Sequence, residues 1–200
     1  MATVKVLIAC EFSGVIRDAF TARGHDAASC DLLPSDRPGR HFKRDIFTAD
    51  GLWNLPTDFD LMIAHPPCTH LSVSGARWFE KRPVQQQEAI RFFMALVDAP
   101  VNRFCIENPV GVMSTLYRKP DQIIQPWQFG HAESKMTCLW LNNLPPLRPT
   151  CVMELPGSGR WSNQTPSGQN NIGPRPDRWK LRSRTYEGIA AAMAQQWGSI

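Results

Sequence analysis

The chain has 200 residues, a formal net charge of +4 at pH 7 and a hydrophobic fraction of 42%. This length and composition suit one globular domain, and the weak positive charge is compatible with a polyanionic partner without requiring one. No apolar run reaches membrane-spanning length and no charged leader opens the chain, so we expect a cytoplasmic protein with no membrane partner.

The first part of the chain alternates strand and helix patterns. Residues 5–12 form an apolar strand pattern, residues 15–23 have helical spacing, and Gly24 is placed to cap that helix before a strand over 25–31. The proline-rich, basic stretch 33–44 predicts a loop. Strand, glycine turn, helix and strand in this order begin a doubly wound nucleotide-binding fold.

The middle of the chain continues this alternation. Residues 60–64 and 103–106 predict two buried strands that are each stopped by proline, with a helix over 83–97 between them. A further strand is predicted at 137–141 and a last helix at 186–197. We therefore expect an α/β fold with a mixed, mostly parallel sheet and helices on both faces.

Periodicity disappears between residues 142 and 181, where prolines and glycines are frequent. The segment is too long to be a simple connection, so it is either a functional insert or a loop that packs its tryptophans on the sheet edge. We expect a core over 1–141, an irregular insert over 142–181 and a C-terminal helix within 182–200 that completes the core.

Six cysteines are scattered along the chain, and none falls in a Cys-x-x-Cys spacing. This pattern predicts reduced thiols and no metal site. Cys68 stands out because it follows two prolines at the end of a predicted strand. Free cysteine is often a small buried hydrophobe, so position alone leaves its role open.

Glu107 favours a catalytic role for Cys68. A glutamate at the end of an apolar strand is costly to bury unless it has a partner or a function. The carboxyl ends of parallel strands meet at the edge of an open α/β sheet where ligands bind. Cys68 and Glu107 at two such ends predict a nucleophile and an acid–base group.

The turn Phe12-Ser13-Gly14 has one glycine where a dinucleotide-binding loop needs three, which disfavours a reductase of Rossmann type. A nucleoside-type ligand without a phosphate fits better. Asp31 is placed to accept hydrogen bonds from a ribose diol, and Asp45 to meet an adenine amino group. Each aspartate alone is more often a solvated residue at a strand end.

In this order the motifs resemble those of the DNA cytosine-5 methyltransferases. Phe-x-Gly follows strand one, an acid strand two, Asp-Ile strand three, Pro-Pro-Cys strand four and Glu-Asn-Pro strand five. The resemblance covers about residues 4–141, with a weaker match at the C-terminal helix. It implies a Rossmann-like S-adenosylmethionine-dependent methyltransferase fold and methyl transfer to carbon 5 of cytosine in DNA. Cys68 would form a covalent adduct with a flipped-out base, and Glu107 would bond its ring nitrogen 3 and exocyclic amine.

The resemblance also implies contacts to the donor. Phe12 would pack on the adenine and Gly14 would permit the turn, while Asp31 and Asp45 would hold the ribose and the adenine edge. The expected donor-binding residues are Phe12, Ser13, Gly14, Asp31, Asp45, Ile46, Pro66 and Thr185. Lys135 would supply positive charge beside the base, as a third catalytic residue, or is simply a solvated lysine.

The chain departs from the family pattern in several places, among them Pro109 after Glu-Asn, where valine is usual, and the final motif, where no clear asparagine is found. Cys10-Glu11 stands where an aspartate usually precedes Phe-x-Gly, and Val15-Ile16 where a second glycine is usual. No Gln-Arg-x-Arg sequence precedes the strand at 137–141. These departures leave the geometry of donor binding open.

DNA contacts are expected from two segments. The loop 69–82 is expected to close over the base as a lid. In the insert, arginine with interleaved tryptophan suits phosphate contacts and stacking on bases. The expected DNA-binding residues are Ser72, Ser74, Arg77, Trp78, Arg160, Trp161 and Arg178. So small an insert predicts a recognition site of about two to four base pairs, or little sequence preference.

A compact enzyme of this kind resembles those of bacteriophages and prophages, and we expect it to act as a monomer in a bacterial or phage-infected cell. Other readings stay open: a non-catalytic DNA- or nucleotide-binding relative, the same chemistry on a free cytosine nucleotide, or a modified donor. Lys135 and the basic stretch 37–44 leave room for a donor with an extra negative charge. Retention of Cys68 and Glu107 favours an enzyme.

Overall fold

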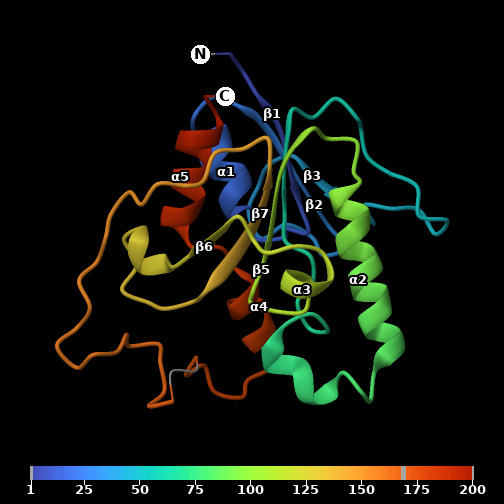
Figure 1. The fold of residues 1–200 in the computed structure, drawn as a ribbon. Helices are drawn as coiled ribbons and strands as arrows, with labels where there is room; N and C mark the ends of the chain where they lie inside the picture. Colours follow the sequence, from blue (N-terminus) through green and yellow to red (C-terminus); the bar gives the residue numbers. More distant parts are fainter. Residues whose placement is uncertain (1, 168–169, 200) are drawn as a thin grey trace.

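The computed structural model describes residues 2–167 and 170–199, without the side chains of residues 75, 77 and 78. Its centre is a seven-stranded sheet in the order β3-β2-β1-β4-β5-β7-β6 (Figure 1). The strands are β1 (Lys5–Ala9), β2 (Asp26–Asp31), β3 (His41–Lys43), β4 (Leu61–Ala64), β5 (Arg103–Asn108), β6 (Gln122–Ile124) and β7 (Thr137–Asn142).

Five helices and two short 3-10 turns connect the strands in the described residues. The helices are α1 (Val15–Thr21), α2 (Pro83–Val97), α3 (Met113–Leu116), α4 (Arg178–Ser183) and α5 (Glu187–Trp197). The turns are η1 (Val73–Trp78) and η2 (Pro126–Gln128). None of the helices in the described residues is long and apolar enough to cross a membrane.

The sheet is mixed. β1 to β5 pair in parallel, whereas β7 runs antiparallel to both β5 and β6. This strand order with one reversed strand is typical of the S-adenosylmethionine-dependent methyltransferase fold. The expected fold class, a mostly parallel mixed sheet with helices on both faces, is confirmed.

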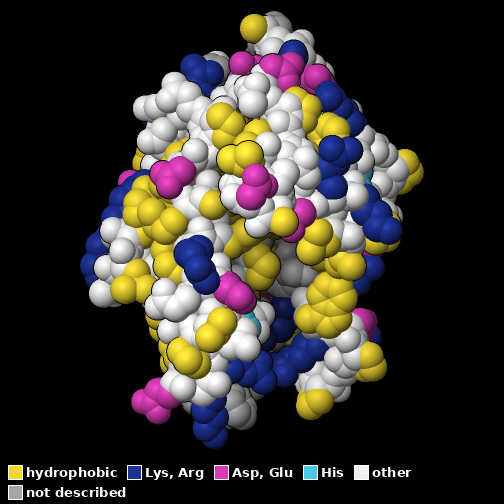
Figure 2. All heavy atoms as spheres, turned by 90° about the vertical axis from the view of Figure 1, so that its right-hand side faces the viewer, with side chains coloured by type: hydrophobic (Ala, Val, Ile, Leu, Met, Phe, Trp, Pro, Cys, Tyr) yellow, Lys and Arg dark blue, Asp and Glu magenta, His cyan; other side chains and the backbone are white. Residues whose placement is uncertain are grey.

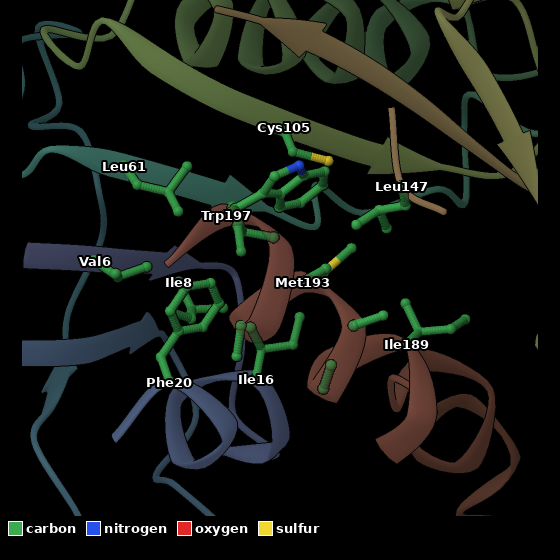
Figure 3. Packing of buried hydrophobic residues seen from close by; sticks show 14 of the residues in the cluster. Val6, Ile8, Ile16, Phe20, Leu61, Cys105, Leu147, Ile189, Met193 and Trp197 are labelled. Atoms are coloured by element: carbon green, nitrogen blue, oxygen red, sulfur yellow. The ribbon is translucent and has the colours of Figure 1, made fainter. Parts of the chain in front are cut away.

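Successive side chains of a strand point to opposite faces, so each central strand feeds two cores. α1 and α5 cover one face and α2 covers the other. Figure 3 shows the first core, where side chains of α1 and α5 meet those of β1, β4 and β5: Ile16, Phe20, Ile189, Met193 and Trp197 against Val6, Ile8, Leu61 and Cys105. Full burial of each large apolar side chain contributes about 1.5–3 kcal/mol to the free energy of folding. This packing holds the helices on the sheet that carries the candidate site.

The helix predicted at 83–97 has the same bounds in the structure, as α2. β1 is shorter than predicted because the chain turns at Cys10, whose φ of 58° ends the extended backbone. The loop predicted over 33–44 is wrong at its end, where β3 pairs with β2. The irregular segment 142–181 likewise ends in the first residues of α4.

Candidate active site

Cys68 lies on a loop that leaves the sheet at the end of β4. The backbone N–H of His65 still donates to the carbonyl of Ala9 at 3.0 Å, and Pro66 then ends the ladder because it has no N–H. The amide of Asn108, only 2% exposed, donates to the carbonyl of Pro66 at 2.7 Å. β5 thus holds the base of the loop that carries Cys68.

A tight turn follows the cysteine. The N–H groups of Leu71 and Ser72 donate to the carbonyl of Cys68 at 3.1 and 2.9 Å, and Ser72 forms an antiparallel bridge with Gly111. A Cβ at Gly111 would lie 2.1 Å from the carbonyl oxygen of Leu71, so this close approach requires glycine. The loops after β4 and β5 are therefore tied together beside the two strand ends.

Glu107 is held by a hydrogen bond to His65. Its Oε2 lies 3.1 Å from Nδ1 of His65, and the two side chains are 18% and 11% exposed. Burial alone would raise the pKa of Glu107, but His65, the charge of Lys135 and the Thr137 hydroxyl together hold its pKa below the usual value. Glu107 is therefore a carboxylate at neutral pH.

Cys68 has the opposite tendency. The residue is exposed, yet removal of water around its sulfur and the charge of Glu107 raise its pKa above the usual value. Arg182 and Lys135 act against this and lower the pKa. The thiol form therefore predominates at neutral pH, and the two cations are the groups that favour the thiolate.

A narrow cavity lies beside Glu107, between β5, β7 and the segment that joins α4 to α5. Its lining residues are His65, Glu107, Ile124, Lys135, Thr137, Ser183, Thr185, Tyr186, Ile189 and Met193. Nζ of Lys135 donates to the carbonyl of Arg182 at 3.0 Å, and the Tyr186 hydroxyl donates to Glu133 at 2.6 Å. The structure therefore brings Lys135 and Thr185 to the same cavity as Glu107.

The irregular first motif has a structural explanation. The buried carboxylate of Glu11 accepts the N–H of Ile16 at 2.8 Å and the hydroxyl of Ser13 at 3.2 Å, at the N-terminus of α1. Gly14 has a φ of 72°, and a Cβ there would lie 2.5 Å from the guanidinium of Arg17. Because Glu11 already occupies the positive end of α1, this turn is not built for a phosphate.

The other expected donor residues differ in their exposure. Asp31 is half-buried at the end of β2, and burial raises its pKa. Burial and the charge of Asp31 raise the pKa of neighbouring Cys30 to about 12, and Asp45 acts on the same thiol. Asp45 is exposed, whereas Ile46 and Pro66 are buried. The two carboxylates thus lie near one edge of the sheet.

The ring of Phe12 is only 6% exposed because α4 covers it. The ring centroids of Phe12 and Trp179 are 5.9 Å apart, and Nζ of Lys180 lies 5.4 Å from the Phe12 ring centre. Lys180 also bonds Asp36 at 2.7 Å. The sequence signal here was a run of basic residues with tryptophan, which we had interpreted as a DNA-binding element.

The residues expected to bind DNA lie in different environments. In the segment 142–181, Trp161 is 6% exposed and stacks on Trp127 with an interplanar angle of 10°, which favours the packing alternative for this ring. Arg160 is exposed and Arg178 is half-buried.

In the loop after Cys68, Ser72 is buried and accepts the N–H of Ser74, which is exposed. The side chains of Arg77 and Trp78 lie outside the described part of the structure. The bridge at Ser72 anchors the first part of this loop, so any closing movement belongs to the residues after it.

Three residues near the site were not found from the sequence. His65 immediately precedes Pro-Pro-Cys and Asn108 follows Glu107, so both had a positional signal. Arg182 had none, because its effect on Cys68 depends on how α4 packs.

Figure 2 shows the face that carries α2, with a recess below its centre. Lys and Arg side chains gather on the floor and lower edge of this recess. The arrangement is suited to an anionic partner.

The sheet order is typical of the methyltransferase fold. No family model matches the sequence, and a search of curated proteins found no match. Among solved structures, the fold is similar to that of a triple mutant of Spodoptera frugiperda DNMT2, with a TM-score of 0.45 and 16% identity. The match covers 80% of this chain and 57% of that one. A similarity of this degree concerns the fold alone.

Proposed function

We propose that this protein is an enzyme that transfers a methyl group from S-adenosylmethionine to carbon 5 of cytosine in DNA. The observation that carries the proposal is the pairing of Cys68 with Glu107 at the ends of two adjacent parallel strands, in loops joined by the Ser72–Gly111 bridge. A nucleophile and an acid–base group held in this way suit addition to a pyrimidine ring.

In the proposed reaction the thiolate of Cys68 adds to carbon 6, and the electron pair of the carbon 5–carbon 6 bond moves to carbon 5. Glu107 bonds nitrogen 3 and the exocyclic amine, which stabilises the charge on the ring. S-adenosylmethionine, when bound, would supply an electrophilic methyl group to carbon 5 and would leave as S-adenosylhomocysteine. The proton on carbon 5 is then lost to water, the bond from carbon 6 to sulfur breaks, and the thiolate leaves.

The chemistry of the residues near β1 and β2 fits such a donor. Phe12 offers an aromatic ring for the adenine, and Asp31 and Asp45 offer carboxylates for hydroxyl and amino groups. Glu11 removes the phosphate-binding capacity of α1, as suits a nucleoside without phosphates. We extend the proposal to the remaining expected donor contacts, namely Ser13, Gly14, Ile46, Pro66 and Thr185.

The DNA partner follows from the same proposal. Cytosine must leave the base stack to reach Cys68, and the cations Lys135 and Arg182 favour an approaching polyanion as well as the thiolate. The segment 142–181 would act as a small recognition insert on the core 1–141, with 182–200 closing the core. Its exposed Arg160 is then a phosphate contact.

Incubation with tritium-labelled S-adenosylmethionine and cytosine-containing duplex DNA tests the function directly. After digestion to nucleosides, we expect label in 5-methyldeoxycytidine. Duplex DNA that contains 5-fluorocytosine should form a covalent adduct with the protein, because fluorine at carbon 5 cannot leave as a proton.

Cys68→Ser is the matched control: it should bind the donor as the wild type does and should form neither product nor adduct. If the wild type binds DNA but forms neither product nor adduct, the protein is a non-catalytic DNA-binding relative of these enzymes. Product formed only on free deoxycytidine nucleotides would mean that the substrate is a nucleotide and not DNA. A C5-modified cytosine other than 5-methylcytosine would mean that the donor is a modified form of S-adenosylmethionine.

A further inference from the structure

His65 connects the two catalytic candidates. It follows β4 and precedes the Pro-Pro-Cys turn, and its Nδ1 lies 3.1 Å from Oε2 of Glu107. The other ring nitrogen, Nε2, is buried and has no hydrogen-bond partner among the described residues. His65 also lines the cavity beside Glu107. His65 therefore has one ring nitrogen on Glu107 and lies at the cavity where we expect the base.

The proposed reaction needs a proton at nitrogen 3 of the base, which Glu107 alone does not supply. Addition of the thiolate to carbon 6 is favoured by a proton on nitrogen 3, and Glu107 is the group beside that atom in the proposal. A carboxylate accepts hydrogen bonds from the exocyclic amine but carries no proton to share. Glu107 is ionised at neutral pH, so the proton has to come from a neighbour. Histidine is the side chain that ordinarily changes its charge near neutral pH.

We propose that His65 relays a proton through Glu107 to nitrogen 3 of the bound cytosine, an inference that rests on the proposed methylation of cytosine. As the bond from sulfur to carbon 6 forms, the proton on Nδ1 moves to Oε2 of Glu107, and Glu107 gives its proton to nitrogen 3. When the thiolate leaves, the proton returns along the same path to Nδ1. The relay ends as it began and consumes no further reactant. His65 contacts Glu107 and not the base, so it is a positioning residue that acts through Glu107.

Charged and titratable groups face this pair from each neighbouring element. They are Cys68 after β4, Lys135 before β7, Cys138 on β7, Arg182 on α4 and Tyr186 at the start of α5. Once Glu107 carries a proton, Lys135 and Arg182 act on the thiolate without an opposing carboxylate.

His65→Asn separates a relay from simple support. The amide nitrogen of asparagine can take the place of Nδ1 and donate to Glu107, but it does not titrate. We expect His65→Asn to bind donor and DNA as the wild type does and to lose about 100-fold or more in the single-turnover methylation rate. A relay needs the proton on Nδ1, so the wild-type rate should fall at high pH, and this limb should be absent in the variant. A wild-type rate and pH profile in His65→Asn would overturn the relay.

His25→Asn is the matched control, because His25 is also buried, at 8% exposure, but lies before β2 at the opposite end of the sheet. It should retain the wild-type pH profile. Nitrogen-15 spectra of the histidine rings give a readout that needs no turnover: Glu107→Gln should shift the signals of His65 and leave those of His25 unchanged.

The two proposals fail in different ways. A wild-type protein that forms no product and no adduct would overturn the methylation, and the relay with it. Normal methylation with a His65 ring that does not respond to Glu107→Gln would overturn the relay alone.

Discussion

At the scale of single residues, the ionisation of Cys68 and that of Glu107 oppose each other. The carboxylate of Glu107 raises the pKa of the thiol, and Lys135 and Arg182 lower it. Neutralising Glu107 removes the opposing charge and leaves the two cations, so the thiolate becomes more favourable. A proton on Glu107 or on the base beside it would therefore activate the nucleophile at the step that needs it.

Glu107→Gln tests this coupling, because it removes the negative charge and keeps the size of the side chain. The pKa of Cys68 should fall, so its alkylation by iodoacetamide at neutral pH should be faster than in the wild type. Methylation should nevertheless fall by about 100-fold, on the scale of losing one preorganised group at the reacting centre. Mass spectrometry of the Cys68 peptide over a pH series measures the first effect.

Asp58→Asn is the control for Glu107→Gln. Asp58 pairs with Lys5 at the other end of the sheet, so its loss should leave alkylation of Cys68 unchanged. Slower or unchanged alkylation in Glu107→Gln would mean that the carboxylate does not govern the thiol.

At the scale of elements, α4 joins the donor side of the site to the base side. A helix of six residues is not stable in isolation, so its position depends on tertiary contacts. Trp179 and Lys180 hold it on Phe12, and the carbonyl of Arg182 accepts from Lys135. We therefore expect a change at the proposed donor side to affect the proposed base side through α4.

Donor binding should move Trp179. An adenine ring can stack on Phe12 only if α4 gives up part of its contact, because the ring is 6% exposed. We expect S-adenosylmethionine to change the tryptophan fluorescence of the wild type, and Trp179→Phe to lose most of that change. Trp161→Phe should keep it, since Trp161 is buried on Trp127. An equal change in Trp179→Phe would place the adenine elsewhere.

At the scale of the whole molecule, the elements with strong periodicity were predictable and the short ones were not. α2 and α5 each carry an apolar face long enough to be recognised from sequence. β3 and β6 have three residues each and α3 has four, too few for any periodicity, and they form because the sheet and its loops provide partners.

The candidate site likewise has residues with a local sequence signal and residues without one. Cys68 and Glu107 can be chosen as candidates from the sequence because proline ends both strands, and parallel strands bring their ends to one edge. The contact between His65 and Glu107 spans 42 positions in the sequence, and the packing of Trp179 on Phe12 spans still more, so neither has a local signal. Such contacts arise only when the sheet order is fixed.

The charge of the molecule predicts how DNA binding should depend on salt. The cations that we expect to meet phosphates are Lys135, Arg160, Arg178 and Arg182. Displacement of about one counterion by each gives a slope of about −3 to −4 for log K against log salt concentration. Fluorescence anisotropy of a labelled duplex over a salt series measures this slope. Arg182→Gln should reduce its magnitude by about one, and Lys5→Gln, at the other end of the sheet and paired with Asp58, should leave it unchanged. An affinity that does not change with salt would exclude these cations as phosphate contacts.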